Sequence, residues 1–200
     1  HYTAGTATRY EPSLLTGDGR HQSLAKGLPI GKRFHSGTVL RFADARPMQL
    51  GHAQIADGRW RLFAFCDGAD PTTAGSPIQR LCEFLAGSPA SPVLRYTPKG
   101  ADIDSVFDVR AVFQQQHIDL DIGRMPALLL PAKGRLGLRD YEKMFCVDRE
   151  HGPDIFDLRE IDRRKGCLVV VRPDQYVADV LPLEDVERLA RFFAGFMVEP

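Results

Sequence analysis

One run of residues, Trp60–Cys66, constrains the fold more than any other part of the sequence. It reads W-R-L-F-A-F-C, so apolar side chains occupy both alternating sets of positions. Successive side chains of a strand point to opposite faces of its sheet, and a strand that is apolar on both faces must be covered on both. The run therefore predicts a central strand of a sheet that is buried on its two sides.

A helix is predicted after this strand. Ser76 is placed to cap it, Pro77 suits its first position, and Gln79 completes a capping box. The apolar residues that follow recur at helical spacing and form one stripe: Ile78, Leu81, Cys82 and Leu85. Gly87 ends the helix.

Other segments with strand-like composition are Thr38–Phe42, Met48–Leu50, Ser105–Gln114, Cys167–Arg172 and Tyr176–Leu181. The last two predict a β-hairpin around Pro173-Asp174-Gln175, and a helix over 183–196 follows them. Residues 132–165 show few clear periods, and within them 138–145 is predicted to form a helical turn. Met125–Pro131 is bracketed by prolines, which predicts a short element.

The order of these elements is strand–helix–strand, then hairpin–helix, which is the order of a thioredoxin-like sandwich. We therefore expect an α/β fold with a central mixed sheet and helices on its faces. Residues 1–30, rich in Gly, Thr and Ser, are expected to form an arm or linker rather than a core element. Residues 31–200 are expected to form the domain itself, with a long insertion before the C-terminal hairpin and helix.

Charge and hydropathy limit the partners. The 200 residues carry 26 basic and 26 acidic side chains, and nucleic acids and anionic membranes call for a basic excess, so neither is expected. The longest apolar run, Leu168–Val171, is far shorter than the roughly 20 residues of a membrane helix. We expect a soluble, cytoplasmic protein. His1, standing where a Met would open a native chain, indicates a piece of something longer.

The sequence has four cysteines: Cys66, Cys82, Cys146 and Cys167. None forms a C-x-x-C pair, so neither a zinc ribbon nor a dithiol motif is present. Three of them lie in apolar runs, where a thiol behaves as a small buried hydrophobe. A thioredoxin-type thiolate needs a place at the N-terminus of the first helix, whereas Cys82 is near the middle of that helix's apolar stripe. Redox chemistry is therefore not expected.

Other candidate sites carry little support. One alternating group could face a metal from an extended segment: His117, Asp119 and Asp121. Such runs are more often solvated loops, and the sequence shows no further groups that would hold these side chains in place around a metal. A hydrolytic triad built from Ser36, His52 or His151 lacks the G-x-S-x-G context.

Three further patterns point to structure rather than to ligands. Gly17-Asp18-Gly19-Arg20 has no preceding strand and no third glycine, so it does not predict a dinucleotide site. Arg163-Arg164-Lys165 is most simply a solvated loop. The Asp57/Arg59 and Arg172/Asp174 charges flank buried strands and are expected to pair as structural salt bridges. No catalytic, cofactor-binding or metal-binding residue is predicted.

Three stretches of the chain carry a family resemblance: Gly31-Lys32-Arg33-Phe34 with Asp44 and Leu50, then Asp57-Gly58-Arg59-Trp60-Arg61-Leu62, and then residues 169–178. The last, V-V-V-R-P-D-x-Y-V-A, is the most specific. Over residues 31–200 the chain resembles the C-terminal thioredoxin-like domain of FAD-dependent aromatic hydroxylases, the phenol 2-monooxygenase and 3-hydroxybenzoate 4-monooxygenase family. The 3-hydroxybenzoate branch is the most similar. Tyr2–Gly5 and Tyr10–Leu15 resemble the stretch that leads into this domain.

The resemblance implies a structural motif of eight residues: Asp57, Gly58, Arg59, Trp60, Arg172, Pro173, Asp174 and Tyr176. Family members often have Gly where this chain has Gln175. Because Gln disfavours positive φ, the turn type of the hairpin stays open.

For the parent protein the resemblance implies FAD- and NAD(P)H-dependent hydroxylation of a phenol or hydroxybenzoate with O₂. The motifs for both cofactors belong to an upstream flavin domain and have no matching positions here. This domain would pack against that upstream domain, take part in homodimer contacts, hold no cofactor or metal, and be inactive alone. Two alternatives stay open: a free-standing thioredoxin-fold redox enzyme using Cys66 and Cys82, and a stand-alone protein-binding module.

Overall fold

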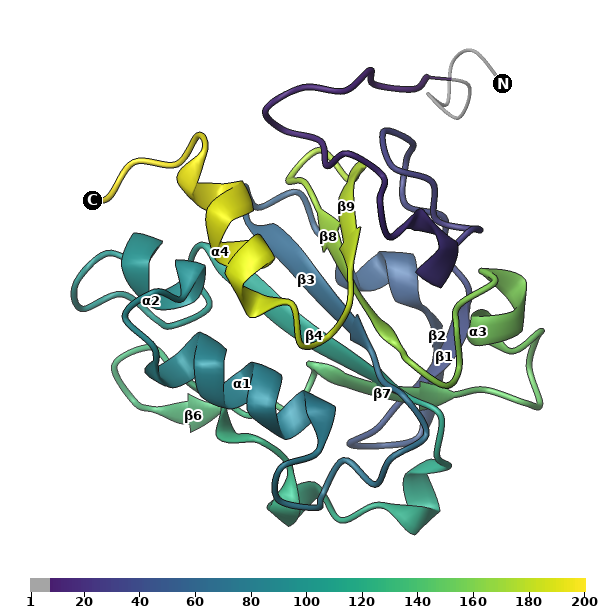
Figure 1. Cartoon of the computed structure of the whole chain (residues 1–200). Coiled ribbons are helices and arrows are strands. Elements are labelled where there is room, and N and C mark those ends of the chain that lie inside the picture. Colours follow the sequence, from purple (N-terminus) through teal and green to yellow (C-terminus); the bar gives the residue numbers. More distant parts are fainter. Residues whose placement is uncertain (1–7) are drawn as a thin grey trace.

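A computed structural model describes residues 8–200 (Figure 1), and a seven-stranded mixed sheet in the order β2-β1-β7-β4-β3-β8-β9 lies at the centre of this part of the chain. Its strands are β1 (Thr38–Arg41), β2 (Arg46–Gln49), β3 (Trp60–Phe65), β4 (Phe107–Phe113), β7 (Met144–Val147), β8 (Cys167–Val171) and β9 (Val177–Leu181). A separate two-stranded sheet pairs β5 (Ala132–Lys133) with β6 (Leu138–Arg139).

The predicted central strand is confirmed, because every residue of β3 is buried. It pairs in parallel with β4 and antiparallel with β8, which in turn pairs antiparallel with β9. The helices α1 (Pro77–Gly87) and α4 (Val186–Ala194) complete the strand–helix–strand and hairpin–helix units. This is the expected thioredoxin-like order, with β7, β1 and β2 extending the sheet beyond β4.

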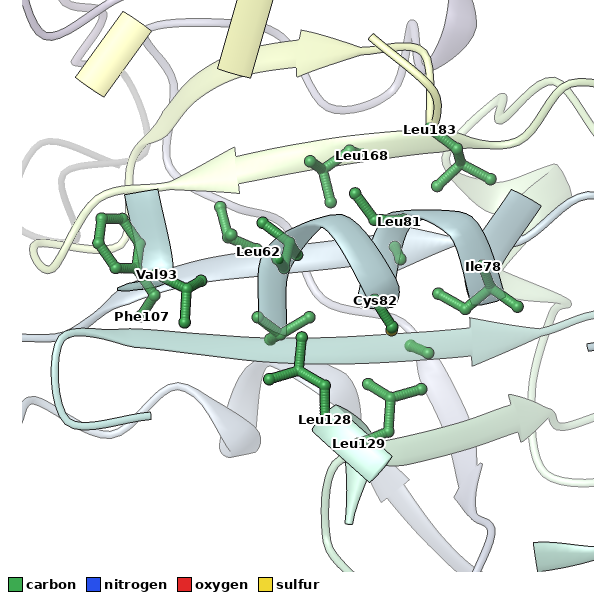
Figure 2. Close-up of a cluster of buried hydrophobic side chains, with 14 of the residues drawn as sticks. Leu62, Ile78, Leu81, Cys82, Val93, Phe107, Leu128, Leu129, Leu168 and Leu183 are labelled. Atoms are coloured by element: carbon green, nitrogen blue, oxygen red, sulfur yellow. The ribbon is translucent and has the colours of Figure 1, made fainter. Parts of the chain in front are cut away.

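Two apolar layers cover the sheet. On one face α1, α2 (Pro92–Tyr96) and α4 lie side by side (Figure 1), and Leu81 of α1 packs over Leu62 of β3 and Leu168 of β8 (Figure 2). The other face is covered by residues 24–34 and by α3 (Ile155–Leu158). Short 3₁₀ helices occupy several connections: η1 (Gln22–Leu24), η2 (Leu50–Ala53), η3 (His117–Asp119), η4 (Ile122–Arg124) and η5 (Ala127–Leu129).

The insertion differs from the prediction in one important respect. Residues 138–145 do not form a helical turn, because they contribute β6 and the start of β7. All four residues of β7 are buried between β1 and β4. A strand this short and this fully buried shows no alternation, so its sequence alone does not distinguish it from a helical turn. The short element expected within Met125–Pro131 is confirmed as η5.

Helix caps were only partly predicted. The Ser76 side chain makes no capping hydrogen bond, and the Gln79 amide donates to the Pro71 carbonyl, so the expected capping box is wrong. Pro77 does occupy the first turn of α1. The helices α2 and α3 were not predicted, since each is too short to show a period, although Ser91 and Asp154 cap them.

The N-terminal segment is more than a linker. Leu24, Ala25, Leu28 and Ile30 are buried in the core, against the expectation that residues 1–30 contribute no core element. A division of the chain at residue 30 stays a prediction. Tyr2–Gly5, which contributed to the family resemblance, lies outside the described residues. Within residues 8–200 no helix is both long and apolar enough to cross a bilayer.

Candidate functional site

The cysteines are all buried and free, as expected. Cys82 lies on the face of α1 that points into the sheet (Figure 2), and burial raises the pKa of its thiol. Burial also raises the pKa of Cys66 and Cys167, and it raises that of Cys146 to about 12. The thiolate is the reactive form, so thiols held neutral near pH 7 support no thioredoxin-type chemistry. The burial of Cys66 and Cys82 favours a structural role for both thiols.

The H-x-D-x-D run does not have the geometry that a metal site would need. His117–Asp119 forms the 3₁₀ helix η3 rather than an extended segment, so its alternate residues do not share a face. Across residues 8–200, no three His, Cys, Asp or Glu side chains are grouped to hold a metal ion.

The other weak candidates have structural partners. His151 pairs with Asp148, with 3.1 Å between Nδ1 and Oδ1. The Ser36 hydroxyl accepts from the Gly51 N–H at 2.7 Å, which leaves it bound to the backbone rather than to either histidine. The Arg163 guanidinium lies 2.9 Å from Asp154 and 3.0 Å from Asp157, so the basic cluster is at least partly a structural loop.

The residues around Gly17 do not fit a flavin dinucleotide. The Gly17 N–H donates to the Ala178 carbonyl at 2.7 Å, so it is not free to bind a phosphate. The Asp18 carboxylate lies 2.6 Å from Arg188 and 3.4 Å from Arg20, so both guanidinium groups already have an anionic partner. This segment therefore holds the chain together rather than a nucleotide.

The first half of the structural motif shapes the start of β3. The Arg59 guanidinium lies 2.7 Å from the Asp57 carboxylate, so the expected salt bridge is present. Burial opposes ionisation of Asp57, but the guanidinium groups of Arg61 and Arg59 outweigh it and hold its pKa well below the usual range. Gly58 has a φ of 79°, and Trp60 packs edge-on against Phe193 of α4 at 5.1 Å.

A cluster of buried charges escaped the sequence analysis. This buried ion network consists of Arg61, Asp104, Asp108, Arg110 and Lys143. Asp108 is its centre: its carboxylate lies 2.6 Å from Lys143, 2.8 Å from Arg110 and 2.9 Å from Arg61. Burial alone would raise the pKa of Asp108, but Arg110 and Lys143 outweigh it and lower the pKa.

A sequence signal for this network existed. Asp108 and Arg110 stand two residues apart within the otherwise apolar segment of β4, so they must share one face of the sheet. Arg61 breaks the apolar run of β3 and is the register partner of Asp108. The network therefore joins β3, β4 and Lys143, the residue that precedes β7. Arg61 also pairs with Asp57 at 2.7 Å, which connects the network to the loop before β3.

The second half of the motif shapes the β8–β9 hairpin. Arg172 and Asp174 form the expected salt bridge at 2.7 Å, and the Gln175 N–H donates to the Arg172 carbonyl to close the turn. Gln175 adopts a φ of 70°, so the turn keeps the conformation that glycine prefers. Its side chain donates to the Gln54 carbonyl at 3.0 Å and accepts from Arg33 at 3.1 Å.

This hairpin is also where the N-terminal segment docks. We call the contact the arm–hairpin junction and define it by Tyr10, Arg33, Arg172, Gln175 and Tyr176. The Tyr10 ring lies edge-on to Tyr176 at 4.7 Å, and the Arg172 guanidinium lies over the Tyr10 ring at 4.3 Å. Stacking of arginine on tyrosine adds a cation–π attraction to this packing.

Backbone hydrogen bonds extend the junction along β9. The Gly31 N–H donates to the Val177 carbonyl at 2.9 Å, and the Val177 N–H donates to the Lys32 carbonyl at 2.8 Å. Gly31 has a φ of 82°, and a Cβ atom there would lie 2.3 Å from the Tyr10 carbonyl oxygen. Only glycine allows the chain to cross itself at this point.

The structure brings the two halves of the motif together. Arg61 is the register partner of Val171 in the antiparallel pair of β3 and β8, so the residues before β3 and after β8 lie at the same end of these two strands. The bond from Gln175 to Gln54 joins the hairpin to the loop before β3. The arrangement consists of buried ion pairs and edge-on aromatic rings, which suits the attachment of one chain segment to another.

One buried carboxylate lies next to this region. Asp179 of β9 lines a pocket of about 300 Å³ with Gly17, Arg20, Asp185, Arg188, Arg191 and Phe192. Burial raises the pKa of Asp179 to about 6, because the Arg188 guanidinium, with its Nε 3.8 Å from Oδ2, compensates only in part.

Comparisons with known proteins agree with this arrangement. The family model of the phenol hydroxylase C-terminal dimerisation domain matches residues 8–200. The chain is 55% identical over 197 residues to a 3-hydroxybenzoate 4-monooxygenase of Comamonas testosteroni, and 32% identical over 201 residues to the FAD-dependent monooxygenase terD of Aspergillus terreus. These alignments cover 98% of this chain but 31% and 32% of the relatives, so the chain spans about a third of their length.

Solved structures share the fold. A crystal structure of a thioredoxin-like protein from Bacteroides caccae superimposes with a TM-score of 0.52 at 11% identity, covering 87% of this chain and 52% of that one. At this level of identity the likeness concerns the fold alone, and it confirms the expected thioredoxin-like architecture.

Proposed function

We propose a function from one premise: this chain belongs to the phenol hydroxylase C-terminal dimerisation domain family. On that premise it serves as the C-terminal structural and dimerisation domain of an FAD-dependent aromatic-ring hydroxylase. The domain takes no part in the chemistry. It supplies a rigid body that attaches to an upstream flavin domain and brings two copies of the enzyme together.

One observation carries the proposal. The family match and the 55% identity extend over nearly the whole chain, yet the chain spans about a third of the relative, a 3-hydroxybenzoate 4-monooxygenase. The thiols of the thioredoxin-like fold are buried, and the glycines near Gly17 are engaged in backbone contacts. The reactive groups of the parent therefore belong to its other two thirds, where FAD and NAD(P)H bind and a phenol or hydroxybenzoate is hydroxylated with O₂.

The arm–hairpin junction is the proposed attachment point of the upstream flavin domain. Tyr10 stands close to the start of the described chain, and its ring is held by Arg172 and Tyr176 of the hairpin. A chain arriving from upstream is thus fixed to the sheet before the domain begins. In this proposal the eight motif residues act by shaping the start of β3 and the hairpin against which the arm packs. The four free cysteines support a reducing location such as the cytoplasm.

The experiment is a flavin titration combined with a mass measurement. The purified chain is mixed with FAD and passed over a sizing column with absorbance and light-scattering detection. We expect a colourless protein eluting with the mass of a dimer. Stoichiometric retention of the yellow cofactor would overturn the assignment of the chemistry to the upstream part. A monomer at every concentration would overturn the dimerisation role.

A further inference from the structure

The β5–β6 hairpin lies outside the two apolar layers that cover the main sheet. It pairs Ala132 with Arg139 and Lys133 with Leu138, apart from the main sheet. Every residue from Gly134 to Arg139 is exposed, so neither face of the hairpin has a core to cover it. An isolated two-stranded hairpin is at best marginally stable in water, so a contact with another surface would stabilise it.

Large apolar side chains gather on this exposed hairpin. Leu136 is 79% exposed, Leu138 is 68% exposed, and Tyr141 just beyond β6 is 47% exposed. Single exposed apolar residues need no explanation, whereas three within six positions place an unusual amount of apolar surface on one short segment.

The hairpin is held in place at its base. Lys133 pairs with Asp104, and the Gly134 N–H donates to Asp102 at 2.9 Å. The Asp140 N–H donates to the Pro131 carbonyl at 2.9 Å. Because Asp104 also pairs with Lys143 at 2.6 Å, the hairpin is anchored to the buried ion network. A patch presented on an anchored support loses little conformational entropy when it binds.

The position of the hairpin favours a second copy as its occupant. The described chain starts beside the β8–β9 hairpin, whereas β6 lies away from that hairpin, below α2 in Figure 1. An upstream domain joins the chain at the end with Tyr10, so the β5–β6 hairpin is separate from that attachment.

Charge complementarity favours the same occupant. Arg135, at the tip of the hairpin, makes no ion pair within residues 8–200. Glu142, near the base, is 67% exposed, and its carboxylate lies 2.7 Å from the Arg41 guanidinium. Arg41 also pairs with Asp44 at 2.6 Å, so the three groups together keep a net negative charge, opposite to that of Arg135. When two hairpins lie side by side across a two-fold axis, the tip of each meets the base of the other. Arg135 of one copy then faces Glu142 of the second.

We propose that the β5–β6 hairpin, together with the residues that follow it up to Glu142, docks against the same segment of a second copy of this chain across a two-fold axis. Leu136 and Leu138 form its apolar centre, and Arg135 and Glu142 form its charged rim. The proposal rests on the proposed function, because it names the surface through which the dimerisation domain would dimerise.

The test introduces a charge into the apolar centre. Leu136→Asp and Leu138→Asp are compared with Leu14→Asp, which changes a leucine of similar exposure, 73%, in the N-terminal segment. Sedimentation velocity over a range of concentrations gives the dimer dissociation constant. Both hairpin variants should weaken the dimer by about 30-fold or more, and Leu14→Asp should leave it unchanged. Circular dichroism and thermal melting of each variant establish that the fold is intact.

A charge exchange tests the two-fold geometry. Arg135→Glu and Glu142→Arg should each weaken the dimer, and the double variant should recover most of the loss. If wild type is a dimer that none of the hairpin variants weakens, the docking surface is wrong and the proposed function stands. If wild type is a monomer throughout, the dimerisation role itself fails.

Discussion

The two edges of the central sheet are protected in opposite ways. At one edge, β9 is buried along its length, and Gly17, Gly31 and Lys32 bind its backbone. At the other edge, β2 is largely exposed and contains Pro47, which has no N–H to offer a further strand. An uncovered edge invites pairing with other chains, and proteins prevent this by covering it or by placing proline and charge on it.

The N-terminal segment protects the β9 edge and leaves the β2 edge to its own residues. At the β9 edge the segment supplies main-chain hydrogen bonds, buried side chains and the ring of Tyr10. At the β2 edge the strand's own residues, Arg46 and Pro47, prevent pairing without further cover. We therefore expect changes at the β9 edge to affect folding strongly and changes at the β2 edge to affect it little.

The largest effect is expected for Gly31→Ala. The new Cβ atom would lie 2.3 Å from the Tyr10 carbonyl oxygen at a φ of 82°, so the segment must move away from β9. Unfolding in urea should show a loss of about 2–4 kcal/mol. Gly19→Ala is the matched control, because Gly19 has a φ of 74° and no atom within 4 Å of its Cβ position. Its loss should be about 1 kcal/mol, the cost of the φ angle alone. Equal losses would mean that the close crossing of the chain is unimportant.

Asp179→Asn should stabilise the protein at pH 7. Burial raises the folded-state pKa of Asp179 to about 6, above its ordinary value of 3.8. The folded protein therefore binds the proton more tightly, and the stability present below about pH 4 is lost as the pH rises through about 6. In urea unfolding at pH 7 the variant should be more stable than wild type by about 1–2 kcal/mol. Its free energy of unfolding should not fall between pH 4 and 6, as that of wild type does. A wild-type stability that is flat over this interval would contradict the expectation.

Substitutions of Gln175 separate the cost of its φ from the value of its hydrogen bonds. Gln175→Ala keeps the φ of 70° and loses the bonds to Gln54 and Arg33, so it should cost about 1 kcal/mol. Gln175→Gly loses the same bonds but relaxes the backbone by about 1 kcal/mol, so it should lie near wild type. Thermal melts of the three proteins give the order. An alanine variant as stable as the glycine variant would show that the φ of this turn carries no strain.

The smallest effect is expected for Pro47→Val on β2. The residue is exposed on an edge strand, so the free energy of unfolding should change by less than about 0.5 kcal/mol. Restoring an N–H at the open edge should instead increase self-association, seen as a rise in light scattering with concentration. A large loss of stability would show that the β2 edge depends on its proline for folding, which would remove the contrast between the two edges.

The prediction of the fold succeeded where a pattern was local. Trp60–Cys66 is apolar on both faces, and α1 carries a stripe of helical period, so both were recognisable without neighbours. β7 was missed because four buried residues show no period, and only its neighbours β1 and β4 make it a strand. The capping box at Ser76 failed because the Gln79 side chain found a better partner in the Pro71 carbonyl.

The candidate site was predicted in part for the same reason. Asp57 with Arg59, and Arg172 with Asp174, are pairs two residues apart, and both formed as expected. The partner of Asp108, Lys143, lies 35 residues away, and that of Tyr10, Tyr176, lies further still. No local spacing shows such contacts.

The sequence by itself determined the layered α/β order, the burial of the cysteines and the lack of a nucleotide motif, because each follows from the side chains of one short segment. Only the tertiary structure decided that the start of β3 and the β8–β9 hairpin lie at the same end of the strands, and that residues 10–34 cover β9. It also decided that Asp108 stays charged in the core. These properties depend on distances between segments far apart in the chain, and such distances are fixed when the sheet assembles.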